Sequence, residues 1–294
     1  MLDYDSIGGL ARRASEQAVT IGQLALADQA QQLALPQEAL LRRMRQDLDV
    51  MRAAARDGAQ KELRSTSGLT GGDGWRMAQY AMGGQALCGP LGSRAIAIAV
   101  AVAECNAAMG RIVAAPTAGS CGILPGTLLA MLEEGRATED QVVLALFTAG
   151  AVGMVIANQA SISGAEGGCQ AECGSASAMA AAALVELQGG TPEMAAHSVA
   201  IALKNQLGLV CDPVAGLVEV PCIKRNAGGV ANALAAADMA LAGIGSVIPV
   251  DEVVQAMQAV GSAMPCALRE TAQGGLAATP TGIALKEKLF GRKT

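Results

Sequence analysis

The sequence has 294 residues, of which 52% are hydrophobic but only 2% aromatic, and its formal net charge is −5. A chain of this length can bury a large core as one domain or as two packed domains, and its composition excludes disorder and collagen. With 26 acidic against 21 basic residues, and no basic run interleaved with aromatics, the chain lacks the charge and the stacking surfaces that nucleic-acid binding needs.

The N-terminal part, residues 1–64, carries most of the charge contrast and predicts an amphipathic helical segment. Apolar residues from Leu40 to Met51 recur at helical spacing after Pro36, which favours a helix with one apolar face. No continuous apolar block stands near the N-terminus, so we expect no secretory signal and a cytoplasmic protein. Residues 65–294 are expected to form a larger helical domain that packs with the first segment as one unit.

Helices dominate the larger segment, after a glycine-rich stretch from Ser65 to Ser93 that predicts loops and short helices. Strand character is confined to residues 216–221. We therefore expect an all-α fold, a compact bundle of buried Ala- and Gly-rich helices. The predicted helices cover residues 94–110, 126–134, 138–161, 175–188, 192–207, 229–243 and 251–263.

Three features refine this prediction. No charged residue occurs from Gln141 to Ala165, but polar residues follow Ala157, so we expect a buried central helix and no membrane span. Thr191 before Pro192 is typical of a helix start. Gly208 is expected to close that helix, and Asp251 to cap another.

Four loops between the predicted helices combine cysteine with glycine, proline or both, which simple surface connectors rarely do. They cover residues 115–126, 164–174, 210–213 and 220–226. Without a secretory signal, the eight cysteines are expected to be reduced thiols and not disulfides.

Six of the eight cysteines divide into two groups. Cys88 and Cys105 lie in or beside apolar segments and are expected to be small buried residues, and Cys266 after Pro265 is also expected to be structural. The second group, Cys169, Cys211 and Cys222, lies at turns whose backbone N–H groups can stabilise thiolates.

Ligand chemistry limits which metal the second group could hold. The close pair Cys169 and Cys173 and a single histidine do not make the paired spacing of structural zinc sites. Soft thiolates suit an iron–sulfur cluster, although ferredoxin spacing is absent. Three dispersed ligands would leave one iron open as a Lewis acid. Spacing alone leaves a cluster site and buried structural cysteines as equal alternatives.

Several segments, however, resemble a known family in sequence and in order. The segments 115–126, 164–174, 207–226 and 264–282 are similar to the α chain of the iron–sulfur-dependent L-serine dehydratases, and the resemblance covers most of the chain after Ser65. It implies an all-helical catalytic domain over residues 65–294. It also implies a [4Fe-4S] cluster held by Cys169 in Gly-Gly-Cys-Gln, Cys211 in Cys-Asp-Pro-Val and Cys222 in Val-Pro-Cys.

The implied reaction is the dehydration and deamination of L-serine to pyruvate and ammonia, a step of amino-acid catabolism that feeds gluconeogenesis. The resemblance implies no pyridoxal phosphate, and Lys204 and Lys224 lie in no phosphate-binding context. It also implies a separate β subunit that completes the pocket, and hence a homo- or hetero-oligomer. His197, Glu166 and Glu172 are weak candidates for the general base, so the base is expected in the partner chain.

Five residues are candidates for binding the substrate carboxylate or amine. Thr117, Gly119 and Ser120 could form an anion-binding nest before the next helix, with a plain interhelical turn as the alternative. Arg225 and Asn226, just past Cys222, could clamp the substrate by charge-assisted hydrogen bonds, or Arg225 could pair with a neighbouring acid.

Two alternative functions remain. A cysteine desulfidase of the same architecture would release sulfide in place of water, and the ligand set does not separate the two leaving groups. A cluster-free helical assembly subunit would use the same cysteines for packing.

Overall fold

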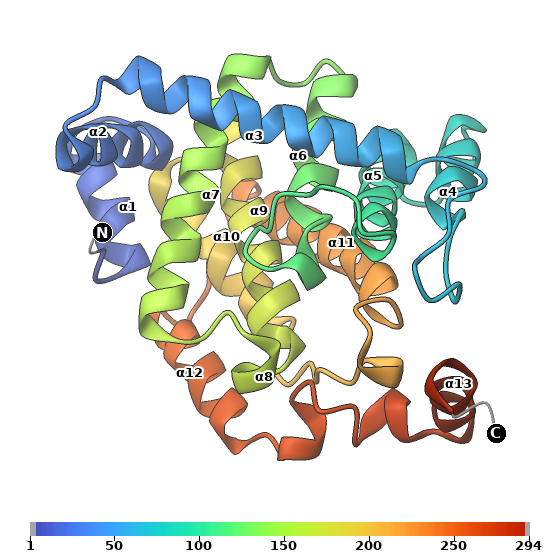
Figure 1. The fold of residues 1–294 in the computed structure, drawn as a ribbon. Helices are drawn as coiled ribbons and strands as arrows, with labels where there is room; N and C mark the ends of the chain where they lie inside the picture. Colours follow the sequence, from blue (N-terminus) through green and yellow to red (C-terminus); the bar gives the residue numbers. More distant parts are fainter. Residues whose placement is uncertain (1–3, 292–294) are drawn as a thin grey trace.

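Figure 1 shows the computed structural model of the chain, which describes residues 4–291. All regular structure in this range is helical, apart from one isolated bridge between Cys211 and Arg269. The predicted all-α class is therefore confirmed. The α-helices are α1 (Ile7–Glu16), α2 (Ile21–Leu33), α3 (Gln37–Gly58), α4 (Asp73–Met82), α5 (Gly89–Ala107), α6 (Ile123–Glu133), α7 (Glu139–Gln159), α8 (Gly164–Gly167), α9 (Ser175–Leu187), α10 (Pro192–Lys204), α11 (Cys222–Leu241), α12 (Val250–Ala263) and α13 (Pro280–Phe290).

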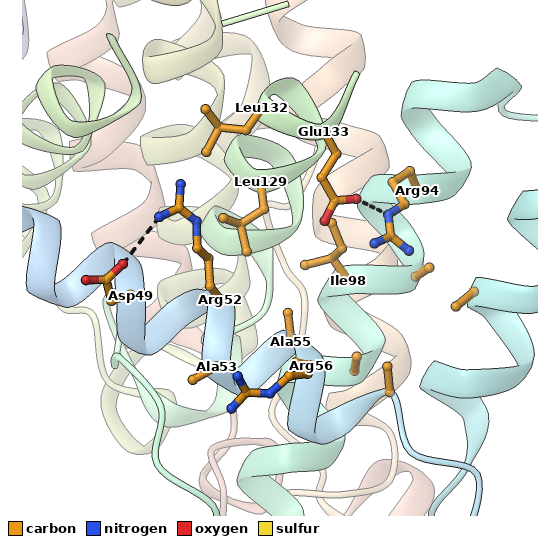
Figure 2. Close-up of a pocket in the computed structure, with 14 residues that line it drawn as sticks. Asp49, Arg52, Ala53, Ala55, Arg56, Arg94, Ile98, Leu129, Leu132 and Glu133 are labelled. Carbon is orange, nitrogen blue, oxygen red and sulfur yellow. Dashed lines mark hydrogen bonds and ion pairs between the residues drawn. The ribbon is translucent and has the colours of Figure 1, made fainter. Parts of the chain in front are cut away.

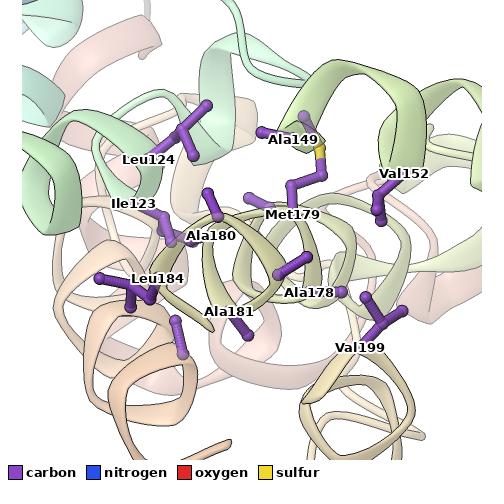
Figure 3. Close-up of a cluster of buried hydrophobic side chains, with 14 of the residues drawn as sticks. Ile123, Leu124, Ala149, Val152, Ala178, Met179, Ala180, Ala181, Leu184 and Val199 are labelled. Atoms are coloured by element: carbon purple, nitrogen blue, oxygen red, sulfur yellow. The ribbon is translucent and has the colours of Figure 1, made fainter. Parts of the chain in front are cut away.

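Helix α9 lies at the centre of the bundle and packs against α6, α7, α10 and α11. Its alanine run Ala180–Ala183 is fully buried. Figure 3 shows alanines of this run among Leu124 of α6, Val152 of α7 and Val199 of α10. Alanine favours the helix, and its small side chain lets neighbouring helices approach closely. A sequence poor in aromatic residues thus fills its core through close helix contacts.

The N-terminal helices cover this core. Helix α3 runs across one end of the bundle and packs on α5 and α7, while α1 packs on α10 and α12. Leu40, Leu48 and Met51 are buried, as the predicted apolar face requires. Side chains from α1–α3 belong to the same hydrophobic cluster as those of α9. The division after residue 64 stays a prediction.

The predicted long apolar helix is α7, and its start is well defined. Thr138 and Gln141 form a capping box, in which each side chain accepts a hydrogen bond from the other residue's backbone N–H. By length and composition α7 alone, among residues 4–291, could cross a membrane, and 67% of that apolar stretch is buried inside the bundle. The prediction of a buried central helix is confirmed.

The predicted cap at Thr191 is confirmed, because its side chain accepts a hydrogen bond from Met194 N. The other two end signals are wrong. Helix α10 ends at Lys204, before Gly208. Asp251 lies inside α12 and accepts hydrogen bonds from the backbone N–H groups of Ile7 and Gly8, so it caps α1 from a distant part of the chain.

Helices α5, α6 and α11 begin three to seven residues earlier than predicted. The glycines at the predicted starts of α6 and α11 lie inside these helices, where they allow close packing. In α11, a Cβ at Gly229 would lie 2.3 Å from Ile123 Cδ1, and in α6 a Cβ at Gly126 would lie 2.7 Å from the Ala95 carbonyl oxygen. Arg225 and Asn226 are consequently helical. Residues 216–221 form a turn and not a strand, since the described structure there is a short 3-10 helix, Val214–Gly216, followed by bends.

Candidate active site

The four loops predicted from sequence meet at one side of the bundle, and backbone hydrogen bonds join the first pair of cysteine segments. Gln170 N donates to the Leu209 carbonyl at 2.9 Å, and Gly208 N donates to Gln170 Oε1 at 2.9 Å. Gln170 is buried, so neither bond competes with bulk water. The turn that carries Cys169 is therefore fixed beside the segment that carries Cys211.

The segment around Cys211 is held from its other side by the 264–282 segment. Cys211 N donates to the Leu268 carbonyl at 2.8 Å, and Glu270 N donates to the Cys211 carbonyl at 2.8 Å. One residue further, Asp212 Oδ2 accepts from Leu276 N at 2.7 Å. These bonds give the fourth segment of the sequence resemblance a structural role, which is to clamp the loop of Cys211.

Arg225 connects all three cysteine segments. It lies one turn after Cys222 on α11. Its guanidinium donates to the Val210 carbonyl and to Asp212 Oδ1, both at 2.7 Å, and its positive charge lowers the pKa of the Cys169 thiol. The Asp212 side chain is only 4% exposed, so this is a buried ion pair. Of the two roles weighed from sequence, the pairing with a neighbouring acid is the one observed.

Asn226 joins α11 to the loop of residues 115–126. Its Nδ2 donates to the carbonyls of Gly119 and Cys222 at 2.8 and 2.9 Å, and its Oδ1 accepts from Gly122 N at 2.8 Å. The residue is fully buried. A single amide thus fixes the loop of residues 115–126 against the start of the helix that carries Cys222.

Glu172 stands between this loop and the cysteines. Its Oε1 accepts from Thr117 Oγ1 at 2.7 Å, and the thiol of Cys211 lies 3.8 Å from its Oε2. The hydroxyls of Thr117 and Ser120 are 3.1 Å apart. Burial raises the pKa of the Glu172 carboxyl, and the hydrogen bond from Thr117 opposes that rise.

Two glycines allow the loops to approach this carboxylate. A Cβ at Gly164 would lie 2.6 Å from Glu172 Oε2 and 3.0 Å from Cys211 Sγ, and one at Gly119 would lie 3.2 Å from Glu172 Oε1. Any larger residue at Gly164 would separate the loops.

The three predicted ligand thiols are close enough to affect one another's ionisation. Burial raises the pKa of Cys222 to about 12, with a further contribution from Cys169. Burial also raises the pKa of Cys211, and Glu172, Cys169 and Cys222 add to it. A hydrogen bond with Cys173 is the main cause that lowers the pKa of Cys169. Within residues 4–291, no three His, Cys, Asp or Glu side chains have the arrangement of a formed metal site.

The remaining cysteines differ from one another in exposure. Cys105 is buried, as predicted. Cys88 is exposed, which corrects the prediction, because it precedes α5 in a loop and not in the apolar helix itself. Cys266 is exposed at a short 3-10 turn. Cys173 received no role from sequence, although its spacing of four residues from Cys169 is the signal that places both thiols on one helical face.

The alternative candidates for acid–base or Schiff-base chemistry have other partners. His197 Nδ1 accepts from Ser246 N at 3.1 Å, and Lys204 Nζ donates to Ser246 Oγ at 2.9 Å. Lys224 pairs with Asp73 at 2.9 Å on the surface. Glu166 is exposed. These contacts support structural roles for the histidine and the two lysines.

The positions of the cavities do not by themselves identify the converging cysteine loops as the site. One cavity, about 620 Å³, lies between α3, α5 and α6 and is lined by Arg52, Arg94 and Glu133 over an apolar floor (Figure 2). It contains no predicted site residue, and an acid contacts each of these two arginines. A second cavity, about 600 Å³, is lined in part by Leu209, Pro221 and Arg225 and so borders the cysteine loops. We place the site at the converging loops because the polar contacts gather there.

Known proteins resemble this chain over nearly its full length. It is 56% identical over 276 residues to "Probable L-serine dehydratase, alpha chain" of Bacillus subtilis (strain 168), a match that covers 94% of this chain and 92% of that protein. It is 46% identical over 272 residues to "L-serine dehydratase, alpha chain" of Peptoniphilus asaccharolyticus, with 92% and 93% covered.

Longer relatives match in part. "L-serine dehydratase 1" of Escherichia coli (strain K12) is 46% identical over 181 residues, which cover 61% of this chain but only 40% of that protein. The sequence model of the family described as "Serine dehydratase alpha chain" matches residues 16–277. The resemblance found in the cysteine and glycine motifs is thus confirmed, and the chain belongs to the serine dehydratase alpha chain family.

Proposed function

We propose that this chain is the α subunit of an enzyme that converts L-serine to pyruvate and ammonia. The names of its relatives, with nearly full mutual coverage of two of them, support the substrate and the reaction. The observation that carries the proposal concerns Arg225, which lies one turn after Cys222, bonds the segment of Cys211 and lowers the pKa of the Cys169 thiol. Packing cysteines need no such shared polar clamp.

The site residues fit an iron–sulfur cluster in their chemistry. Cys169, Cys211 and Cys222 are soft donors, and two of them are buried to 4% exposure. Arg225 supplies positive charge beside the thiolates. These three cysteines would hold a [4Fe-4S] cluster, whose open iron would supply a Lewis acid for the departing hydroxyl. Because the thiols of Cys211 and Cys222 have raised pKa values, iron binding would release protons.

Thr117, Gly119 and Ser120 are proposed to bind the substrate carboxylate. Thr117 and Ser120 present adjacent hydroxyls, and Asn226 fixes the Gly119 carbonyl so that the loop keeps its shape. The Thr117 hydroxyl donates its proton to Glu172, so the Ser120 hydroxyl and the backbone N–H groups of the loop are the donors proposed for the carboxylate. Arg225 retains N–H groups beyond the two that are bonded and can donate to the same carboxylate. Asn226, with its amide already bonded at both ends, would act on substrate through the loop it holds.

We propose that a separate β subunit completes the pocket and supplies the general base, in a cytoplasmic heteromer. The alpha-chain names of the relatives support a second subunit. The longer E. coli protein supports it too, because the match leaves most of that chain uncovered.

The test is strictly anaerobic expression of the chain with and without a candidate β partner, followed by cluster analysis and serine-dependent pyruvate release. We expect a cluster in both preparations and full activity only with the partner. A chain that is fully active alone would refute the need for a partner. A cluster-loaded complex that releases no pyruvate from serine would refute the reaction.

The same protein preparations distinguish the proposed reaction from the two alternative functions. Offering L-cysteine beside L-serine and following sulfide against pyruvate discriminates a desulfidase. Iron and acid-labile sulfide analysis discriminates a cluster-free assembly subunit, which would contain neither.

A further inference from the structure

Two thiols in the described structure are positioned to react with each other. Cys169 Sγ and Cys173 Sγ lie 3.3 Å apart, and both residues are buried, at 4% and 1% exposure. A disulfide bond is about 2.05 Å long, so the sulfurs need approach by little more than 1 Å. Cys173 is outside the proposed ligand set, and the proposed reaction gives it no task.

The backbone around this pair can accommodate the approach. Cys169 directly precedes a π-helical turn, Gln170–Gly174, in which the regular α-helical hydrogen bonding is interrupted. Gly168 before Cys169 has a φ of +74°, and Gly174 follows Cys173. Glycine adjusts its dihedral angles at little steric cost, so a small shift of either cysteine stays local.

We propose that Cys169 and Cys173 form a reversible disulfide when the chain lacks its cluster and meets a peroxide. The sulfur of Cys169 attacks hydrogen peroxide, the O–O bond breaks, and the thiol proton leaves with the departing hydroxide, so that a sulfenic acid and one water form. The Cys173 sulfur then attacks the sulfenyl sulfur, the S–S bond forms, and the S–O bond breaks to release the second water. Two thiols lose two electrons in total, and the peroxide gains them.

This modification would preserve a residue that the cluster needs. A sulfenic acid with no thiol nearby proceeds to sulfinic acid, which ordinary thiol reductants do not reverse. With Cys173 at 3.3 Å, the intermediate is captured first, and a dithiol reductant then returns both thiols. The pair itself does not depend on the serine reaction, so the proposal can fail or succeed separately from the proposed function.

The sequence allows a clean measurement on the full-length chain. No lysine or arginine lies between Arg136 and Lys204, so trypsin releases one peptide, residues 137–204, whose only cysteines are Cys169 and Cys173. The peptide of residues 205–224 carries Cys211 and Cys222 and serves as an internal control. Cluster-free chain is treated with two equivalents of hydrogen peroxide per chain, one more than the disulfide consumes, and is then alkylated and digested. Mass spectrometry measures the peptide masses.

We expect the 137–204 peptide to lose two hydrogens and both alkylation sites, while the 205–224 peptide keeps both of its sites. Dithiothreitol should restore the two sites. In Cys173→Ala, Cys169 should instead gain two oxygens, and reductant should not recover it. The Cys173→Ser variant, whose side chain is polar, should give the same result as Cys173→Ala. Circular dichroism reports whether either variant folds.

The proposal is overturned if the wild-type 137–204 peptide remains fully alkylated. It is also overturned if that peptide carries sulfinic acid, or if Cys169 is found linked to the 205–224 peptide.

Discussion

The alanine-rich core around α9 and the cysteine loops beside it are built in different ways. In the core, Ala180–Ala183 contact α6, α7 and α10 through small apolar surfaces, and no particular polar partner is required. In the loops, single side chains such as Arg225 and Asn226 each satisfy two or three backbone or carboxylate groups. The core therefore depends on residue size, and the loops depend on residue identity.

This difference has a consequence for substitutions. A buried polar group whose partner is removed loses its hydrogen bond without regaining one from water. A substitution in the apolar core instead costs free energy according to the apolar surface it removes and the cavity or overlap it creates. Single substitutions in the loops should therefore cause a large loss of cluster content or of unfolding free energy. Substitutions in the core should cause losses whose size depends on the space around the substituted residue.

The largest effect is expected at a ligand. Cys211→Ser should remove the cluster entirely, because a serine oxygen is a poor replacement for a soft thiolate. Cys88→Ser, at an exposed cysteine, should leave cluster content unchanged. Anaerobic iron and acid-labile sulfide assays on both variants measure this, and equal content in the two would mean that the ligand assignment is wrong.

Loss of the ion pair between Arg225 and Asp212 should have the next largest effect. Arg225→Met leaves Asp212, with a side chain only 4% exposed, as an unpaired buried charge, so the cluster-free chain should lose about 3–5 kcal/mol of unfolding free energy. The adjacent Lys224→Met removes a lysine that is 71% exposed and should cost at most about 1 kcal/mol. Urea denaturation under reducing conditions measures both, and similar losses would contradict the assigned role of Arg225.

Close helix contacts in the core give a smaller, graded effect. A Cβ at Gly58 of α3 would lie 1.7 Å from the Ala101 carbonyl oxygen of α5, so Gly58→Ala must separate the helices at a cost of about 1–3 kcal/mol. Gly150 of α7 has nothing within 4 Å of its Cβ position. Gly150→Ala should stabilise by about 0.5–1 kcal/mol. Thermal denaturation of the pair should give shifts of opposite sign, and shifts of the same sign would contradict the packing.

The smallest effect is a pH dependence at Glu186, a half-buried acid at the end of α9. Glu186 accepts from Thr148 Oγ1 at 2.7 Å and from Gly22 N at 3.2 Å, and burial raises the pKa of its carboxyl above the ordinary 4.5. Above that ordinary value the unfolded chain has lost a proton that the folded chain keeps, so stability falls as pH rises toward the folded pKa. Glu186→Gln removes this contribution.

We therefore expect the unfolding free energy of the wild type, relative to Glu186→Gln, to decline as pH rises from about 4.5 and then to level off above the raised pKa. Urea titrations of both proteins at a series of pH values measure the difference. Parallel curves would show that Glu186 does not titrate in this way.

Sequence signals between neighbouring residues predicted the helical fold well. Features that depend on contacts between distant residues could not be predicted. The cap at Thr191 and the apolar α7 are properties of neighbouring residues, so they could be read directly. The capping of α1 by Asp251 joins residues 243 and 244 apart in sequence, and no periodicity reveals it.

The same distinction applies to the site. The family motifs identified Cys169, Cys211 and Cys222, but their mutual position depends on Arg225, which lies inside a helix that was predicted to begin later. That helix was predicted to begin at Gly229, but Gly229 lies inside α11, where it allows close packing against Ile123. A glycine needed for close packing and one needed for a turn look alike in sequence.

The central claim is that three cysteines from separate segments hold one cluster with an open iron. Mössbauer spectroscopy of the chain, reconstituted anaerobically with isotopically enriched iron and sulfide, tests it most directly. The account predicts a spectrum in which one iron differs from the other three, and no cluster spectrum in Cys211→Ser. Isolated iron alone, or the same cluster spectrum in that variant, would contradict it.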